Sequence, residues 1–110
     1  MRTSLAVTTA TNHGDILALT SADLVNGSQF INDGSTVLGI YNADPVNTMT
    51  ITIQVPKLVD GNLTVQNRVY YAPPLMTYLI GKLPKDVYNQ ADNNVYIDFS
   101  IPALVAVVSM

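Results

Sequence analysis

The clearest pattern in the chain is a strict alternation of apolar and polar residues near its middle. Met49, Ile51, Ile53 and Val55 are apolar, and the positions between them hold threonine or glutamine. A period of two residues is typical of a β-strand with one face in a core and the other in water. We therefore predict a half-buried strand over residues 48–55.

A shorter apolar run precedes this strand. The residues on both sides of Gly39, from Val37 to Tyr41, are apolar, and Asn42-Ala43-Asp44-Pro45 follows them. Proline has a fixed φ and no N–H donor, so the hydrogen-bond ladder should stop at this point. We predict that Thr36 to Val55 is a β-hairpin with a loop of several residues.

The N-terminal region carries weaker signals. Residues 1–14 contain only a short apolar stretch and predict either an extended arm or an edge strand. From Ile16 to Val25 the apolar residues fit neither the helical period nor the strand period. Either Ser21 caps a single helical turn that ends at Gly27, or residues 15–20 form a strand and the following residues its turn.

Several later segments also read as strands. Phe30 lies in a short segment that runs into an Asn-Asp-Gly turn, and we assign it to the core. Alternation resumes in residues 63–71, where a bend would keep Val69 and Tyr71 on the core face and place Tyr70 outward. Residues 75–81 form a further strand whose facing the pattern leaves open.

Two strands are predicted near the C-terminus, after a connection that includes a helical turn from Pro84. Val95, Ile97 and Phe99 alternate with more polar residues and indicate a half-buried strand. Leu104 to Val108 is apolar at every position, as expected for a strand covered on both faces. We predict that another subunit provides one of those covers.

These segments together predict the fold class. About seven or eight short strands, separated by turn signals, are typical of a sandwich or small barrel. No segment has the helical period over a length that could connect parallel strands. We predict an all-β fold, with residues 15–110 forming a single antiparallel β-sandwich or jelly-roll-like domain and residues 1–14 an arm or edge segment.

Composition narrows the functional classes. The chain has no cysteine, which excludes thiolate catalysis, zinc-thiolate sites and disulfides. Charged residues make up 12% of the chain and the net charge is −3, so we expect no nucleic-acid partner. No stretch has the length of a membrane span or a signal-peptide core. So little charge on a chain this hydrophobic predicts that part of the surface is buried against another chain.

The sequence shows no candidate catalytic site. His13 is the one histidine, and we interpret it as an exposed loop residue because it stands beside Gly14. All acidic residues are aspartates, and most occupy turns, as in the segments around Asp33, Asp44 and Asp92 and in Asp60-Gly61, where carboxylates accept backbone hydrogen bonds. We therefore predict that the protein is not an enzyme and that it has no metal site and no cofactor.

Tyrosines and the C-terminal run are the candidate interface. Tyrosine buries a large area while keeping a polar tip, and it is enriched where proteins meet. The alternative is that these rings pack against neighbouring loops of the same chain. The candidate interface residues are Tyr41, Tyr70, Tyr96, Val105 and Val107.

The order of several motifs resembles a known class of proteins. The resemblance is carried by the segment Gly27 to Thr36, the strand to Tyr41, the threonine-rich strand to Val55, and Gly81-Lys82-Leu83-Pro84 followed by Tyr88-Asn89 and Asp92. This order is similar to that of small β-rich virion proteins encoded near the major capsid protein of tailed bacteriophages and prophages. The resemblance covers residues 27–108. It departs from the family at Asp92-Asn93-Asn94, where Asp-Gly would be expected.

The resemblance implies a capsid decoration, or cement, protein. Such a protein would bind the major capsid protein on the outer surface of the virion, after synthesis in the host cytoplasm, and would act as a homotrimer. Two other classes stay open: a head-completion or tail-joining protein, and a carbohydrate-binding or receptor-binding β-sandwich module.

Overall fold

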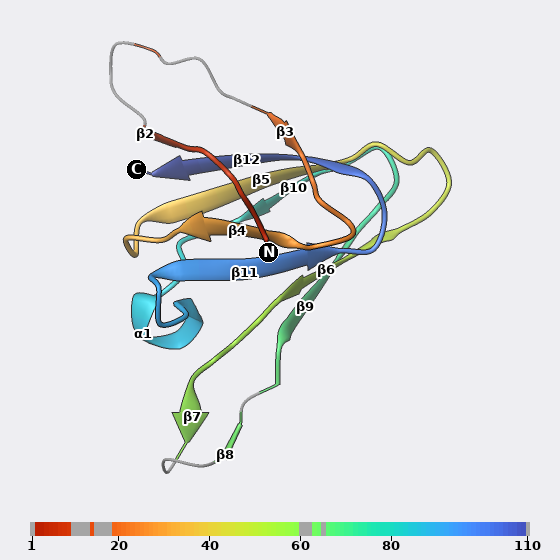
Figure 1. The fold of residues 1–110 in the computed structure, drawn as a ribbon. Helices are drawn as coiled ribbons and strands as arrows, with labels where there is room; N and C mark the ends of the chain where they lie inside the picture. The colour runs from red at the N-terminus through yellow and green to blue at the C-terminus, as the bar shows by residue number, and fades with distance from the viewer. Residues whose placement is uncertain (1, 10–13, 15–18, 60–62, 65, 110) are drawn as a thin grey trace.

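The protein is a β-sandwich of two sheets packed face to face (Figure 1). The structure, a computed structural model, describes residues 2–9, 14, 19–59, 63–64 and 66–109. In sheet I the strand order is β1 (Thr3–Ser4), β4 (Ser28–Ile31), β11 (Asn94–Phe99), β6 (Met49–Ile53) and β9 (Arg68–Ala72). In sheet II the order is β10 (Thr77–Ile80), β5 (Thr36–Asn42), β12 (Ala103–Ser109) and β2 (Val7–Thr9), and β3 (Thr20–Ser21) also pairs with β12.

The predicted all-β sandwich is confirmed. Among the described residues, every strand of four or more residues lies in a segment that the sequence predicted to be a strand, and the additional strands β1, β2 and β3 are two or three residues long. A two-stranded hairpin, β7 (Leu58–Val59) and β8 (Leu63–Thr64), projects from one end. The helix α1 (Lys85–Tyr88) follows Pro84, where a helical turn was predicted.

The core lies between the two sheets and uses the inward half of each alternating strand. Phe30, the core residue predicted before the Asn-Asp-Gly turn, is fully buried. The inward residues of β6 and β11 are also buried, as predicted, and β5 and β12 supply the opposite layer. The inward side chains are Leu38 and Ile40 of β5, Met49, Ile51 and Ile53 of β6, Val95, Ile97 and Phe99 of β11, and Val105 and Val107 of β12.

The predicted hairpin over Thr36 to Val55 is wrong. β5 belongs to sheet II, where it pairs with β10 and β12, and β6 belongs to sheet I, where it pairs with β9 and β11. The connection between them crosses from one sheet to the other at Asn42, whose side chain is fully buried. Its amide donates to the carbonyls of Asn47 at 2.9 Å and Ala72 at 3.0 Å, so buried hydrogen bonds hold the crossing in place.

The predicted facing of β9 is also wrong. In the β6–β9 register Ile51 stands opposite Tyr70, so Tyr70 points toward the core and Val69 and Tyr71 point outward. The predicted facing assumed that the alternation that begins at residue 63 continues into β9. That assumption fails because β8 and β9 belong to different sheets and the chain changes direction between them.

The N-terminal segment forms two edge strands. β1 runs parallel to β4 in sheet I, and β2 runs parallel to β12 in sheet II, with the buried Leu5 between them. Farther along, the chain turns at Asp23–Asn26 and leaves the turn at Gly27, with Asp23 rather than Ser21 accepting the backbone N–H groups. The expectations for His13, for residues 15–18 and for the Asp60-Gly61 turn lie outside the described residues.

We predict that replacing Ile51 by aspartate unfolds the domain. Ile51 is fully buried at the centre of β6, and an unpaired carboxylate there would cost several kcal/mol, comparable with the 5–15 kcal/mol that typically stabilises a domain. Thr50→Asp is the matched control, because Thr50 points outward on the same strand. Far-UV circular dichroism should show loss of the β-sheet signal for Ile51→Asp only. A cooperative melt at the wild-type temperature would contradict the assignment of this strand.

Candidate functional site

The outer faces of the two sheets differ in chemistry. Sheet I presents mostly polar side chains, including Gln29, Thr50, Thr52 and Asp98. On the strands β5, β10 and β12 of sheet II, no outward side chain carries a charge. We call these outward residues the sheet II face: Val37, Gly39 and Tyr41 of β5, Thr77 and Leu79 of β10, and Leu104, Ala106 and Val108 of β12.

A hollow lies in the sheet II face. Its volume is about 480 Å³, and it is lined by Leu19, Gly39, Tyr41, Thr77, Leu104 and Ala106. Gly39 and Ala106 face each other across the β5–β12 pair and form its floor. The hollow exists because the two smallest residues of the face are neighbours while larger side chains surround them. Among the described residues of the lining, the polar side-chain groups are the hydroxyls of Tyr41 and Thr77.

The side of the sandwich next to the hollow exposes further apolar residues. β10 has one neighbour among the described strands, β5, so its other edge is open. Leu79 on this strand is 72% exposed, and Met76 in the preceding turn is 58% exposed. Met76 thus adds an exposed apolar side chain beside the sheet II face, and exposed apolar surface of this kind marks interaction sites on soluble proteins.

The structure separates the three tyrosines named from the sequence. Tyr41 points outward, as predicted, and it lines the hollow. Tyr96 also points outward, but from sheet I, where its hydroxyl donates to Asp92 Oδ2 at 3.2 Å. The prediction for Tyr70 is wrong, because Tyr70 packs against the core and meets the Tyr78 ring edge-on at 5.8 Å. Burial raises the pKa of Tyr70. The pKa of Tyr96 is raised mainly by partial desolvation and, to a smaller extent, by the nearby Asp92 carboxylate.

Val105 and Val107 are core residues of the subunit, which corrects their assignment to an interface. Both are 1% exposed and point between the sheets. The residues of β12 that point outward are Leu104, Ala106 and Val108. An uninterrupted apolar run carries no alternation signal, so only the register against β5 identifies its outward members.

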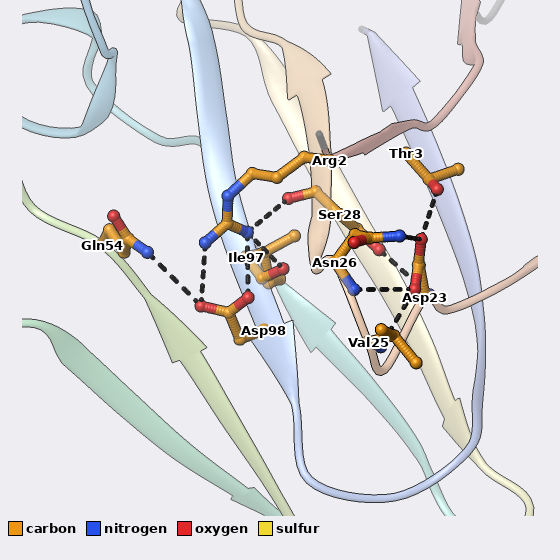
Figure 2. A network of polar contacts seen from close by, with 9 residues as sticks. All are labelled: Arg2, Thr3, Asp23, Val25, Asn26, Ser28, Gln54, Ile97 and Asp98. Atoms are coloured by element: carbon orange, nitrogen blue, oxygen red, sulfur yellow. Dashed lines mark hydrogen bonds and ion pairs between the residues drawn. The ribbon is translucent and has the colours of Figure 1, made fainter.

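A polar network on sheet I is the other concentration of functional groups (Figure 2). Arg2 donates from Nη1 to Asp98 Oδ1 at 2.9 Å and from Nη2 to Oδ2 at 3.2 Å, a bidentate ion pair. Nη1 also donates to the Ser28 carbonyl at 3.1 Å, and the guanidinium lies over the Tyr96 ring, 4.6 Å from its centroid. The network ties β1 to β11.

Gly27 makes room for this ion pair. Its φ of 79° lies in the region that favours glycine. A Cβ at this position would collide with Arg2 Nη1 and Asp98 Oδ1. The close approach of the chain to the ion pair therefore requires the absence of a side chain.

Asp23 fixes the turn beside the network. Its Oδ1 accepts the N–H groups of Val25 and Asn26, each at 3.0 Å, and its Oδ2 accepts the Thr3 hydroxyl at 2.6 Å. The backbone hydrogen bond from Asn26 and the hydroxyl of Thr3 lower the pKa of Asp23 from 3.8 to about 2. The carboxylate thus connects the turn to β1.

The other turn aspartates behave as the sequence predicted. Asp33, Asp44 and Asp92 each accept a backbone N–H within their own turn, and these hydrogen bonds lower the pKa of each carboxyl. Within the described residues, no three histidine, cysteine or acidic side chains gather as metal ligands would. No helix of the described part has the length and hydrophobicity to cross a membrane.

No protein-family model matches this chain, and neither a curated protein nor a solved structure matches it.

We predict that Gly27→Ala destabilises the protein more than Gly14→Ala does. Both glycines have positive φ, but a Cβ at Gly14 meets no atom within 4 Å, whereas at Gly27 it displaces the Arg2–Asp98 pair. The excess cost should be about 1 kcal/mol, the scale of a partly exposed, bidentate ion pair. Thermal unfolding of the two variants measures it. Equal losses would mean that the ion pair contributes nothing to stability.

We also predict that Asp23 contributes to acid sensitivity. Its pKa is lowered by folding, so its stabilising effect is present above its unfolded value and is lost as the pH falls from about 4 toward 2. Asp23→Asn cannot titrate. The fall in melting temperature between about pH 4 and pH 2 should therefore be smaller in the variant than in the wild type. An identical fall in both proteins would assign the acid sensitivity to other groups.

Proposed function

We propose that this chain is a structural virion protein that decorates and stabilises a bacteriophage capsid by binding the major capsid protein, and that copies of it associate through the sheet II face. The observation that carries the proposal is the uncharged, apolar outer face of sheet II with its hollow. The motif order that resembles capsid decoration proteins supplies the biological setting.

The contrast between the two outer faces supports an associative role. An antiparallel sheet commonly has one face on the core and one in water, and the strands β6 and β11 of sheet I follow this rule, although Val69 and Tyr71 of the edge strand β9 are also exposed on that face. Sheet II has apolar side chains on both faces, and its outward Leu79 is 72% exposed. Burying such a face releases roughly 25 cal/mol per Å² of apolar area and needs no charge to be desolvated. A cement protein needs this kind of contact, because its work is to hold subunits together.

The geometry favours this role over the carbohydrate-binding alternative. A sugar site needs several directed polar groups beside an apolar platform, whereas the lining of the hollow offers the hydroxyls of Tyr41 and Thr77. A head-completion or tail-joining protein would use the same kind of apolar contact but in far fewer copies. The number of copies on a particle therefore distinguishes the two structural roles.

The deciding experiment is quantitative mass spectrometry of particles purified from the phage or induced prophage that encodes the chain. A decoration protein is expected in hundreds of copies per particle, in fixed ratio to the major capsid protein. About a dozen copies or fewer would favour a connector role. Absence from the particles would refute the proposal.

A paired substitution tests the role of the sheet II face. Leu79→Ser should weaken self-association of the isolated protein, because Leu79 is 72% exposed on this face. Tyr71→Ser is the control, because Tyr71 is 64% exposed but points outward from sheet I. Both variants should have a free energy of unfolding within about 0.5 kcal/mol of that of the wild type, as is usual for surface substitutions. If sedimentation shows equal losses of association, or none, the sheet II face is not the contact.

A further inference from the structure

We propose that copies of this chain join head to tail, with Leu75 of one copy inserted into the hollow on the sheet II face of the next, so that the assembly closes into a ring. This inference deepens the self-association of the proposed function and rests on it. It is carried by a strained, exposed leucine and an unfilled apolar hollow on the same molecule.

Leu75 has a backbone conformation that leucine rarely adopts. It follows Pro73-Pro74 in a turn closed by the N–H of Met76, which donates to the Pro73 carbonyl at 3.3 Å. Leu75 is the third residue of this turn and has a φ of 57°. Glycine or asparagine is favoured at that position of a type II turn, because a side chain with Cβ is strained there.

The turn is held in place from inside the domain. The N–H of Leu75 donates to the carbonyl of Asn42 at 3.0 Å, and the N–H of Asn42 donates to the carbonyl of Met76 at 3.1 Å. The fully buried side chain of Asn42 adds a hydrogen bond to the Pro73 carbonyl at 3.3 Å. Leu75 is therefore presented on a rigid support and loses little further conformational freedom when it binds.

The subunit itself gains little from this leucine. Its side chain is 53% exposed and is not part of the core cluster. Strained residues persist where the surrounding structure enforces them, and they gather at binding sites. A rigid turn that holds a large apolar side chain toward water is best explained by a contact outside the subunit.

The hollow fits the role of the receiving site. It has a volume of about 480 Å³, and Leu75 is not among the described residues that line it, so Leu75 does not fill the hollow of its own copy. Thr77, two positions after Leu75, does line it. The inserting residue and the receiving hollow therefore lie near the same end of sheet II but are different surfaces. A contact between two different surfaces produces a ring when its rotation closes.

Charge favours a second copy of the chain over an anionic partner. The loop of residues 43–48 and the turn of residues 73–76 contain no lysine or arginine. A membrane surface or a nucleic acid would need basic residues around the inserted leucine. The described residues that line the hollow carry no charge, which suits an inserted apolar side chain.

The test uses two single variants and their mixture in sedimentation velocity. Leu75→Asn removes the inserting side chain and keeps a residue that tolerates positive φ, and Ala106→Leu fills the floor of the hollow. Val25→Asn is the control, because Val25 is 91% exposed in another turn of the same molecule. The wild type and Val25→Asn should form the homotrimer, and each of the other two variants should associate at least tenfold more weakly, the effect of one lost apolar side chain.

The mixture identifies the head-to-tail contact. Leu75→Asn keeps its hollow, and Ala106→Leu keeps its leucine, so an equimolar mixture retains one intact contact and should form a one-to-one heterodimer that cannot close. Monomers in the mixture, a trimer formed by Leu75→Asn alone, or a monomeric wild type would each overturn the inference. Leu75→Gly, which also relieves the strain, confirms that any loss comes from the side chain and not from unfolding.

Particle binding is measured separately from this assembly. If the wild type forms the ring but is absent from purified particles, the inference stands and the capsid role is refuted. Hundreds of copies on particles together with a Leu75→Asn variant that still forms the trimer would keep the capsid role and refute the inference.

Discussion

The antiparallel pairing of β5 with β12 is the constraint on which the rest of the structure depends. It runs from Thr36 opposite Ser109 to Asn42 opposite Ala103. This register turns Leu38, Ile40, Val105 and Val107 toward sheet I and gives the sandwich half of its core. It also places Gly39 beside Ala106 on the other side of the sheet. The hollow is therefore a consequence of the same pairing that builds the core.

Two buried asparagines stabilise the connections at the ends of β5. Asn42 hydrogen-bonds three carbonyls at the crossing to β6 and at the turn before β10. Asn32, before β5, donates to the Leu83 carbonyl at 3.0 Å and to Asn89 Oδ1 at 2.8 Å, which ties the segment around α1 to the domain. Burying an amide is favourable only when its donors and acceptors are paired. The paired amides therefore hold the chain in one hydrogen-bonded arrangement at both ends of β5.

The division of chemistry between the sheets links the fold to the proposed role. Sheet I keeps a charged pair, Arg2 and Asp98, and polar side chains that suit contact with water. Sheet II presents an apolar face, an open edge strand and the strained turn at Leu75. If the sheet II face binds neighbouring subunits, as proposed, each molecule adds to the assembly in a defined orientation. That property is what a protein that reinforces a shell requires.

The sequence by itself determined where the longer strands lie and which residues of β4, β6 and β11 enter the core, as Phe30, Ile51 and Ile97 demonstrate. It also identified the turn aspartates, because their hydrogen bonds are local. Only the tertiary structure decided that β5 and β6 lie in different sheets, that Tyr70 points inward, and that Leu104, Ala106 and Val108 face outward in place of Val105 and Val107. The physical reason is that alternation describes one strand at a time, whereas partner, register and facing are set by hydrogen bonds between strands far apart in the chain.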